Sequence, residues 1–316
     1  MSRDILTLTL NPALDLSANV EQVVPGPKLR CSAPRFDPGG GGINVSRAIA
    51  VLGGTSRTIV AVGGAIGERL LAMLEDEGIM ALPVRLAGET RQSLAITESE
   101  TNRQYRFVFP GPAWGPKEDA AALNALSGQI MPSGFVVVSG SMPVGVGSEL
   151  LNDIKRQAAQ VGAALVLDTS GDALKAALDP GPGPLALLRI DQSEAESIAG
   201  KDFATGSDLA DFANTLLERG VAERIVLSLG DKGTVGVTRH EQTLCVPPRV
   251  AVESAVGAGD SLLAALVLRL SQGKNLAEAV AYGTAAAASA VATPATALCD
   301  RKTTDSHYQN VTVTAL

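Results

Sequence analysis

Short uninterrupted runs of apolar residues recur along the chain, and longer stretches between them carry apolar residues three or four positions apart. The runs are typical of strands buried on both faces: Ile59–Val62, Phe135–Val138, Ala164–Leu167, Leu185–Leu188 and Arg224–Leu229. The stretches with the helical period are Gly67–Glu77, Ser148–Val161, Asp172–Leu178 and Ser207–Arg219. Because strand and helix alternate, we expect an α/β fold whose central sheet is mainly parallel and has right-handed crossovers.

Two segments depart from this alternation. Leu14–Phe36 and Leu94–Phe109 alternate polar with apolar residues, most clearly from Tyr105 to Phe109. Such strands have one wet face and cannot lie inside a sheet that helices cover on both sides. We therefore expect a small separate sheet, with strands drawn from about residues 14–36 and 90–110, that serves as a lid, as a dimer surface, or as both.

The chain shows no long repeat and no linker-like tract, so we expect residues 1–316 to form a single domain with its lid. Apolar residues make up 46% of the chain and charged residues 19%, which is the balance of a folded globular protein. No uncharged apolar stretch reaches the length of a membrane span, so we expect no membrane partner.

The charge balance and the cysteines narrow the classes of function. The chain has 26 basic and 33 acidic residues, a formal net charge of −7, so no global positive field attracts nucleic acid. Cys31, Cys245 and Cys299 are widely spaced, which excludes a dense disulfide framework and a zinc knuckle. The chain also starts without a signal-peptide pattern, and together these features predict a cytoplasmic protein.

Four consecutive glycines, Gly39–Gly42, run directly into a predicted helix. Backbone without side chains can approach a ligand closely, and a helix start adds unpaired N–H groups. Asn44 offers both a donor and an acceptor, which suits sugar hydroxyls. The alternative interpretation is a tight turn that serves packing alone. The run lacks the spaced glycines of a dinucleotide fold, and no phosphate-binding GxxxxGK[ST] motif occurs.

A second helix start framed by glycines lies at Gly257-Ala258-Gly259-Asp260. The backbone N–H groups of Gly257, Ala258 and Gly259 would point outward at the positive end of the helix and form an anion hole. Asp260 can then accept the proton of an attacking hydroxyl while the amides and a metal ion hold the charge of a transferring phosphoryl group. The alternative is that Asp260 only caps the helix.

A third glycine-rich turn, Ser228–Gly233, follows a predicted strand. Its glycines, Gly230 and Gly233, allow a turn that can line a nucleotide, although strands commonly end in such turns without any ligand. His240 and His307 have neighbours in neither metal nor triad spacing, so we expect no histidine metal site and no hydrolase triad.

Charged residues of the lid segments are candidates for binding a phosphorylated substrate. Lys28 and Arg30, at i and i+2 of an expected strand, would share one face, and Arg91 lies in the second lid segment. The alternative is that all three are ordinary solvated surface charges. Asp15 can accept hydrogen bonds from sugar hydroxyls, or is a turn carboxylate.

The glycine run with Gly41-Gly42-Ile43-Asn44, and the helix start Val256-Gly257-Ala258-Gly259-Asp260, resemble the two signatures of the PfkB, or ribokinase-like, carbohydrate kinases. Within that family the chain is most similar to the bacterial ATP-dependent type 2 6-phosphofructokinases, over nearly its whole length. The resemblance implies a three-layer αβα fold with a β-sheet lid, and phosphorylation of fructose 6-phosphate at its C1 hydroxyl with ATP and Mg²⁺. Tagatose 6-phosphate or fructose 1-phosphate as acceptor is the alternative, and a non-catalytic sugar-phosphate or nucleotide sensor is a rival from another class.

The resemblance also implies residue roles and an assembly. Asp260 would be the base, with Gly257, Ala258 and Gly259 as the anion hole. The residues implied on the acceptor side are Asp15, Gly39, Gly40 and Asn44 for the sugar, with Lys28, Arg30 and Arg91 for its phosphate. The residues implied on the nucleotide side are Ser141, Asp191, Ser228, Gly230 and Gly233. A homodimer through the lid is implied as well, with a lid lysine that reaches the neighbouring subunit's site.

The chain departs from the family pattern at two places. The family's Lys-Pro-Asn-x-x-Glu segment, whose Asn and Glu organise magnesium and phosphates, reads Arg189-Ile190-Asp191-Gln192-Ser193-Glu194. Glu194 is retained, but Asp191 is an acceptor-only carboxylate that can bind Mg²⁺ through water and repels phosphates without a metal. Relatives have Gly-Thr-Arg-Leu-Cys near a monovalent-cation loop where this chain has Ala295-Thr296-Ala297-Leu298-Cys299, which counts against potassium activation.

Overall fold

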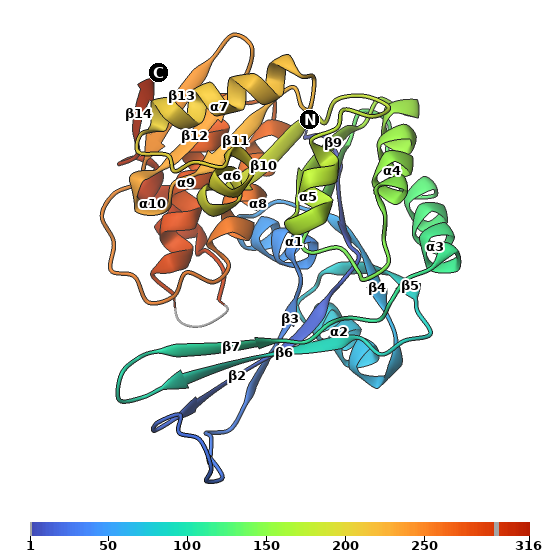
Figure 1. Cartoon of the computed structure of the whole chain (residues 1–316), viewed down its shortest axis with the longest axis vertical. Coiled ribbons are helices and arrows are strands. Elements are labelled where there is room, and N and C mark those ends of the chain that lie inside the picture. The colour runs from blue at the N-terminus through green and yellow to red at the C-terminus, as the bar shows by residue number, and fades with distance from the viewer. Residues whose placement is uncertain (1, 294–296) are drawn as a thin grey trace.

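The computed structural model describes residues 2–293 and 297–316 and contains two sheets (Figure 1). Within these residues the larger sheet has ten strands in the order β14-β13-β12-β11-β10-β9-β8-β1-β4-β5. Its parallel strands are β1 (Ile5–Thr9), β4 (Arg57–Val62), β5 (Met80–Arg85), β8 (Phe135–Ser139), β9 (Ala164–Asp168), β10 (Leu187–Asp191) and β11 (Ile225–Ser228). The strands β12 (Thr234–Val237), β13 (Gln242–Val246) and β14 (Thr312–Ala315) extend it antiparallel. The predicted, mainly parallel sheet is confirmed.

Helices cover both faces of this sheet, which confirms the three-layer αβα architecture. One layer holds α1 (Gly41–Val51), α2 (Gly64–Asp76), α8 (Ala258–Ser271), α9 (Leu276–Val291) and α10 (Arg301–Tyr308). The opposite layer holds α3 (Pro116–Ser127), α4 (Ser148–Gln160), α5 (Gly171–Ala177), α6 (Gln192–Ala199) and α7 (Gly206–Glu218). The apolar runs are continuous because alternate residues of a strand pack into opposite layers: Phe135 and Val137 of β8 face one layer, and Val136 and Val138 the other.

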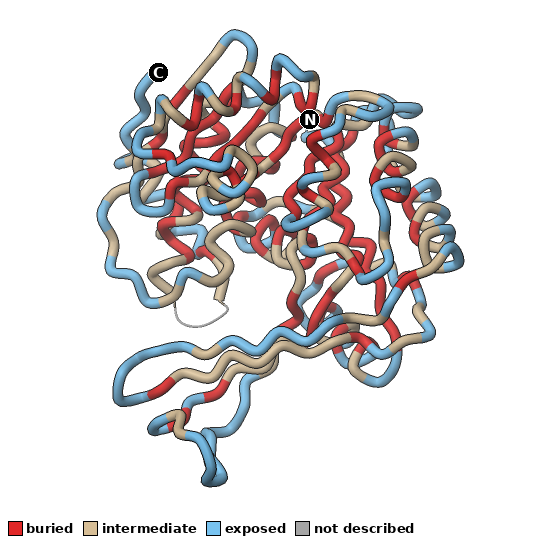
Figure 2. The backbone as a smooth tube through the Cα atoms, in the orientation of Figure 1, coloured by how far each residue is buried: buried red, intermediate tan, exposed pale blue. Residues whose placement is uncertain are grey.

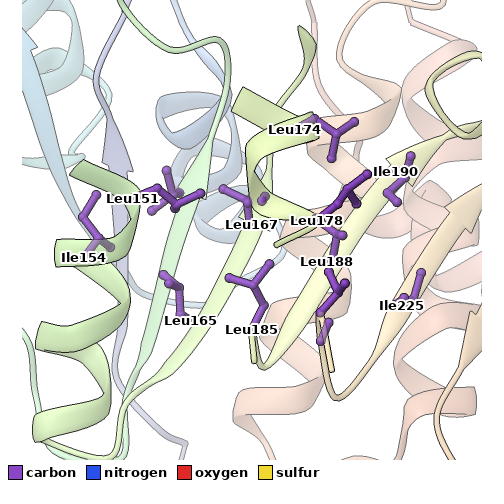
Figure 3. Packing of buried hydrophobic residues seen from close by; sticks show 14 of the residues in the cluster. Leu151, Ile154, Leu165, Leu167, Leu174, Leu178, Leu185, Leu188, Ile190 and Ile225 are labelled. Atoms are coloured by element: carbon purple, nitrogen blue, oxygen red, sulfur yellow. The ribbon is translucent and has the colours of Figure 1, made fainter. Parts of the chain in front are cut away.

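The buried residues are concentrated between the layers of the body (Figure 2). Figure 3 shows part of this core, where Leu165 and Leu167 of β9 lie among Leu151 and Ile154 of α4 and Leu174 of α5. A rigid body of this kind can hold side chains in fixed positions at the carboxyl ends of its parallel strands.

The smaller sheet has the order β3-β2-β6-β7 and projects from the body as a separate layer (Figure 1). Its strands are β2 (Ala13–Val20), β3 (Arg35–Gly39), β6 (Arg91–Glu98) and β7 (Gln104–Val108). They come from the two segments whose polar and apolar residues alternate, so the predicted separate sheet is confirmed. We call this sheet the lid.

The lid does not continue through the whole first segment, and the prediction that Lys28 and Arg30 share one strand face is wrong. Residues 21–34, between β2 and β3, form no strand. Pro25-Gly26-Pro27 explains the break, because proline cannot donate to a strand ladder and Gly26 adopts a positive φ of 103°. Lys28 and Arg30 are exposed in this loop.

The strand predicted at Leu185–Leu188 runs instead from Leu187 to Asp191. Leu185 makes only an isolated parallel bridge with Ala222. The shift matters because Arg189 and Asp191 become part of β10, where Asp191 pairs with Ser228 at the end of the neighbouring β11. Charged side chains are thereby brought to the carboxyl ends of adjacent strands.

The described part of the chain contains no helix with the length and apolar character that crossing a membrane requires. The cysteines Cys31, Cys245 and Cys299 are free, and only Cys31 is exposed. Burial raises the pKa of Cys245 and of Cys299 to about 11, so neither thiol ionises near neutral pH.

Candidate active site

The N-terminal ends of α1 and α8 meet at the carboxyl ends of the parallel strands. Asn44, in the first turn of α1, donates a hydrogen bond from Nδ2 to Oδ2 of Asp260 over 2.9 Å. Asp260 lies in the first turn of α8 and is 216 residues away in the sequence. The positive ends of two helix dipoles therefore converge on one carboxylate, at a place where an anion is stabilised.

Both helices begin at a glycine whose backbone excludes other residues. Gly40, before α1, has a φ of 120°, and a side chain there would place its Cβ 2.7 Å from Cγ2 of Thr9. Gly257, before α8, has the left-handed φ of 79°. Only glycine adopts such angles at little cost, so the helix starts are left with bare backbone facing the space between them.

The surroundings of Asp260 shield its carboxyl group from water, and this is the main influence on its pKa. Burial and the nearby carboxylate of Asp168 raise its pKa to about 6, against the opposing effects of the Asn44 hydrogen bond and the Arg189 guanidinium. A carboxyl group with a pKa near 6 is ionised at neutral pH and yet basic enough to accept a proton. This is the property that a general base needs.

Arg189 and Asp168 complete the environment of Asp260, and neither is among the site residues predicted from the sequence. Arg189 donates from Nη1 to Oδ1 of Asp168 over 3.2 Å and from Nη2 to Oγ of Ser228 over 3.1 Å. Ser139 donates to the second oxygen of Asp168 over 3.1 Å. A Cβ added to Gly259 would lie 3.1 Å from Nη2 of Arg189, so the guanidinium is packed against the first turn of α8.

The sequence carried a signal for both residues. Arg189 interrupts an apolar strand in the middle of the sheet, with its side chain 13% exposed, and a buried charge requires a partner. Asp168 ends β9, the strand that pairs with β10, so the two lie at the same edge. The Nε of Arg189 makes no hydrogen bond within the described residues, so this N–H remains available as a donor.

A second group of predicted residues surrounds the first residues of the lid. Asp15 of β2 packs against Gly39, where an added Cβ would lie 2.1 Å from Oδ2 of Asp15. Burial raises the pKa of Asp15, while Arg91 and a hydrogen bond with Ser93 oppose the shift. Arg91 donates to the carbonyl oxygen of Asn11 from Nη2 over 3.1 Å. The structure thus brings Asp15, Gly39 and Arg91 together at the base of the lid.

Ser141 belongs to this lid side of the site. Its Oγ accepts a hydrogen bond from Nδ2 of Asn11 over 3.1 Å, and Asn11 is also the residue that Arg91 contacts. Ser228, in contrast, ends β11, which is separated from β8 by β9 and β10. Ser141 and Ser228 therefore face different parts of the site.

The turn after β11 lies on the side of Ser228. It contains a short 3₁₀ helix, Gly230–Lys232, with Gly230 and Gly233 at positive φ angles of 59° and 116°. A Cβ at Gly233 would lie 2.3 Å from the carbonyl oxygen of Cys245, so the turn is packed tightly against β13. Its backbone forms a fixed edge beside Ser228 and Arg189.

Asp191 and Glu194 form a reciprocal capping box at the start of α6. Oδ1 of Asp191 accepts from the backbone N–H of Glu194 over 2.8 Å, and Oε2 of Glu194 accepts from that of Asp191 over 2.9 Å. The second oxygen of each carboxylate makes no hydrogen bond within the described part of the chain. Burial raises the pKa of Glu194, with the Asp191 hydrogen bond opposing it.

These two carboxylates fit a magnesium ion that arrives with a phosphate ligand. Mg²⁺ takes hard oxygen ligands, keeps several waters and usually binds one or two carboxylates together with phosphates. Among residues 2–293 and 297–316 there is no group of three His, Cys, Asp or Glu side chains that could hold a metal ion alone. The arrangement matches shared coordination and not a resident protein cage.

Two further predictions concern the lid loop and the segment compared with a monovalent-cation loop. Lys28 and Arg30 are exposed in the loop at the tip of the lid, which Figure 1 shows far from the starts of α1 and α8. Of the segment compared with the monovalent-cation loop, Ala295 and Thr296 lie outside the described residues. The prediction about potassium therefore stays a prediction.

Comparison with known proteins identifies a family. The model of the pfkB family carbohydrate kinases matches residues 9–303. The ATP-dependent 6-phosphofructokinase isozyme 2 of Mycobacterium tuberculosis is 39% identical over 305 residues, covering 96% of this chain and 89% of that protein. The Escherichia coli isozyme 2 is 39% identical over 304 residues, covering 96% and 97%. The 1-phosphofructokinase of Xanthomonas campestris is 32% identical over 271 residues, covering 85% of each.

Solved structures of the Escherichia coli protein agree with this chain throughout. The phosphofructokinase-2 complex with potassium superposes with a TM-score of 0.92 at 39% identity, over 98% of this chain and 99% of that one. The complex with fructose-6-phosphate gives 0.90 at 38% identity over the same shares. A tetrameric inhibited form of that enzyme gives 0.91.

Proposed function

The chain belongs to the pfkB family of carbohydrate kinases, and from that premise we propose that it transfers the γ-phosphoryl group of ATP to the C1 hydroxyl of fructose 6-phosphate. The observation that carries the proposal is the hydrogen bond between Asn44 and Asp260, which joins a proton acceptor to the starts of α1 and α8. The relatives named as ATP-dependent 6-phosphofructokinases, at 39% identity over 96% of the chain, support this choice of substrates.

In this proposal Asp260 is the general base. Its carboxylate takes the proton of the C1 hydroxyl, and the hydroxyl oxygen forms a bond to the γ-phosphorus. The bond from that phosphorus to the oxygen bridging it to the β-phosphate breaks, and ADP leaves. The pKa of about 6 supports this role, because the group is ionised at pH 7 to 8 and is a stronger base than an ordinary aspartate.

The transferring group carries negative charge that the protein must stabilise. We assign this task to the backbone N–H groups of Gly257, Ala258 and Gly259 at the start of α8, together with the guanidinium of Arg189, which packs against Gly259. Fixed donors in a site that excludes water stabilise a developing charge strongly, because they need no rearrangement during the reaction.

The acceptor is proposed to bind between α1 and the base of the lid. Asp15, Gly39, Gly40 and Asn44 would hold the sugar hydroxyls, and Arg91 its phosphate. Ser141 is assigned to this side as well, because it lies beside Asn11 and not beside Ser228. Since the body and the lid both supply these residues, we propose that residues 1–316 work as a single kinase domain.

The nucleotide is proposed to bind along Ser228, Gly230 and Gly233. Asp191 and Glu194 would hold Mg²⁺, with Asp191 acting through a metal-bound water. When bound, this ion supplies neutralisation of the β- and γ-phosphate charge. The acidic Asp191 would repel phosphates in its absence, and nearby Arg189 offsets part of that charge.

We propose that the working unit is a dimer formed through the lid. Asp15 lies on the polar face of the lid. The opposite face carries the apolar side chains of Leu16, Leu94, Ile96, Tyr105 and Phe107. Phe107 is 49% exposed and the other four side chains are half-buried, so this face is partly open in the single chain. An isolated sheet gains stability by packing such a face on a copy of itself. A second lid would also bring its loop with Lys28 and Arg30 to a neighbouring site.

The experiment that tests the function is a panel of acceptors with saturating ATP and Mg²⁺. Release of ADP is followed with fructose 6-phosphate, tagatose 6-phosphate and fructose 1-phosphate, and kcat/KM is compared, since pocket contacts set this preference. We expect the highest value for fructose 6-phosphate. A higher value for fructose 1-phosphate would reassign the chain as a 1-phosphofructokinase, in line with its 32% identical relative.

A non-catalytic sensor is the rival from another class. It is suggested by Asp191, which places a second carboxylate beside Glu194 on the proposed nucleotide side. Calorimetric binding of ATP and a sugar phosphate, without any phosphorylated product after prolonged incubation, would support the sensor. We expect product instead, because Asp260 and the donors around it are all in place.

A further inference from the structure

Arg47 uses all of its guanidinium nitrogens away from any proposed ligand. It lies one turn after Asn44 in α1, and its Nε and Nη2 donate to the two carboxylate oxygens of Glu77 over 2.6 and 2.8 Å. Nη1 donates to the backbone carbonyl of Pro38 over 3.2 Å. The Arg47 side chain is 12% exposed and that of Glu77 is 36% exposed, so the two-point contact is buried on its arginine side and open to solvent at the carboxylate.

The position of Glu77 is electrostatically unfavourable for a carboxylate. It is the residue that ends α2, at the negative end of the helix dipole, and the last turn of α2 has no basic residue. A carboxylate at this end destabilises a helix unless a cation compensates it. Arg47 provides that cation from α1, so the pair ties the end of α2 to the middle of α1.

The Arg47–Glu77 pair holds the last part of the lid strand β3, through the Pro38 carbonyl. Pro38 is followed directly by Gly39 and Gly40, where β3 becomes the glycine run (Figure 1). Two residues earlier, the ring of Phe36 lies under the guanidinium of Arg69 of α2, with 3.7 Å from Cζ to the ring centroid. The carboxyl end of β3 is therefore fastened to the body at two points.

We propose that Arg47, held by Glu77, is a positioning residue for the acceptor site. It fixes the Pro38 carbonyl and so keeps Gly39–Gly42 in the shape that receives the sugar, while it touches neither substrate. The effect on catalysis rests on the proposed function, whereas the effect on the backbone does not.

The test uses Glu77→Gln and Arg47→Met, with Glu75→Gln as the matched control on the exposed surface of the same helix. We expect Glu77→Gln to raise the KM for the acceptor roughly 5-fold and Arg47→Met roughly 20-fold. The KM for ATP should stay within about twofold, because the residues assigned to the nucleotide lie on β10, on β11 and in the turn after it, in the other sheet from β3. The double variant should be no worse than Arg47→Met alone, since the two residues act as one unit.

A second readout does not depend on the substrate. Amide hydrogen exchange of residues 39–44 in the ligand-free chain should become faster in Glu77→Gln and stay unchanged in Glu75→Gln. If the wild-type chain phosphorylates none of the sugars, the proposed function fails while this measurement still decides the positioning role.

Three results would overturn the inference. The first is unchanged exchange in residues 39–44 of both variants. The second is a rise of the ATP KM equal to that of the acceptor KM. The third is a lower melting temperature with unchanged KM values, which would show that the pair only stabilises the fold. If Arg47→Met does not fold, Glu77→Gln decides alone, because its side chain is 36% exposed and the change is nearly isosteric.

Discussion

The carboxyl group of Asp260 combines two requirements that normally oppose each other. Desolvation and the nearby carboxylate of Asp168 favour its neutral form, and the hydrogen bond that it accepts from Asn44 favours its charged form. The balance leaves the pKa at about 6, so a proton can be taken up and released near neutral pH. Arg189 reduces the repulsion between the two carboxylates.

Replacing Asp260 by Asn should lower kcat roughly 10³-fold with both KM values nearly unchanged, because a general base contributes about this factor. Steady-state ADP release, with Asp211→Asn on the surface of α7 as control, measures the effect. In the wild-type chain, kcat should fall as the pH drops through about 6. Turnover within tenfold of the wild type would remove Asp260 from the role of base.

The same replacement should raise the melting temperature at pH 8. The folded state holds the Asp260 proton more tightly than the unfolded state, whose pKa is near 3.8. Stability from this group is therefore complete below pH 4 and is lost as the pH rises through 6, at a cost of up to about 3 kcal/mol. Thermal unfolding at pH 4 and pH 8 checks this, and equal gains at both values would contradict it.

Asn44→Ala should shift the acidic limb of the kcat profile to higher pH. The amide donor favours the charged form of Asp260, so its removal raises that pKa further. The profile should be recorded at saturating acceptor, because Asn44 is also proposed to bind the sugar. An unshifted limb would mean that the 2.9 Å hydrogen bond does not persist in the complex.

At the scale of elements, function depends on how α1 and α8 begin. A helix start offers unpaired N–H groups only where the preceding backbone leaves them accessible, and the glycines before both helices do this. The capping box of α6 shows the opposite outcome, since Asp191 and Glu194 satisfy the N–H groups with their own side chains. The starts of α1 and α8 are therefore open to ligands, whereas the start of α6 presents carboxylates.

Gly40→Ala should lower stability by about 1 to 3 kcal/mol and raise the KM for the acceptor more than that for ATP. The φ of 120° strains any side chain, and the added Cβ meets Thr9. Gly147→Ala is the control, because Gly147 precedes α4 with a negative φ of −92° and an added Cβ has no atom within 4 Å. Urea unfolding and steady-state kinetics measure both effects, and equal behaviour of the two variants would contradict the prediction.

At the scale of the whole molecule, the lid's two faces have different tasks. The face with Asp15 turns toward the body, where a cavity of about 670 Å³ lies between the lid and residues 252–255. The opposite face, with Leu94 and Phe107, is only partly covered, and Phe107 is 49% exposed. In the proposed dimer the same sheet would line the substrate site and join two subunits, which would link assembly to activity.

Phe107→Asp should therefore shift the chain from a species of about twice 32.3 kDa to a monomer and reduce activity with it. Val108→Asp is the matched control, because Val108 is 63% exposed on the other face of the same strand. Light scattering after size-exclusion chromatography gives the masses. Monomeric wild-type protein with full activity would refute the dimer proposal, as would equal effects of the two variants.

The layered α/β fold, the separate lid and the two helix starts framed by glycine could all be predicted from the sequence. These features are local: strands buried on both faces are continuous apolar runs, and a glycine run before a helix has few other uses. The identity of Asp260 as a candidate base and of Gly39–Gly42 as a candidate ligand loop followed from such short-range patterns.

Which residues of the site become neighbours depends on the tertiary structure. The pairing of Arg189 with Asp168, the contact of Asn44 with Asp260 and the place of Ser141 on the lid side all join residues from different strands and helices. Lys28 was predicted to lie on a strand, but Pro25-Gly26-Pro27 interrupts the strand and leaves Lys28 in a loop. Spacing along a chain says little about such contacts, because the order of strands in the sheet and the crossing of helices over it bring distant side chains together only after folding.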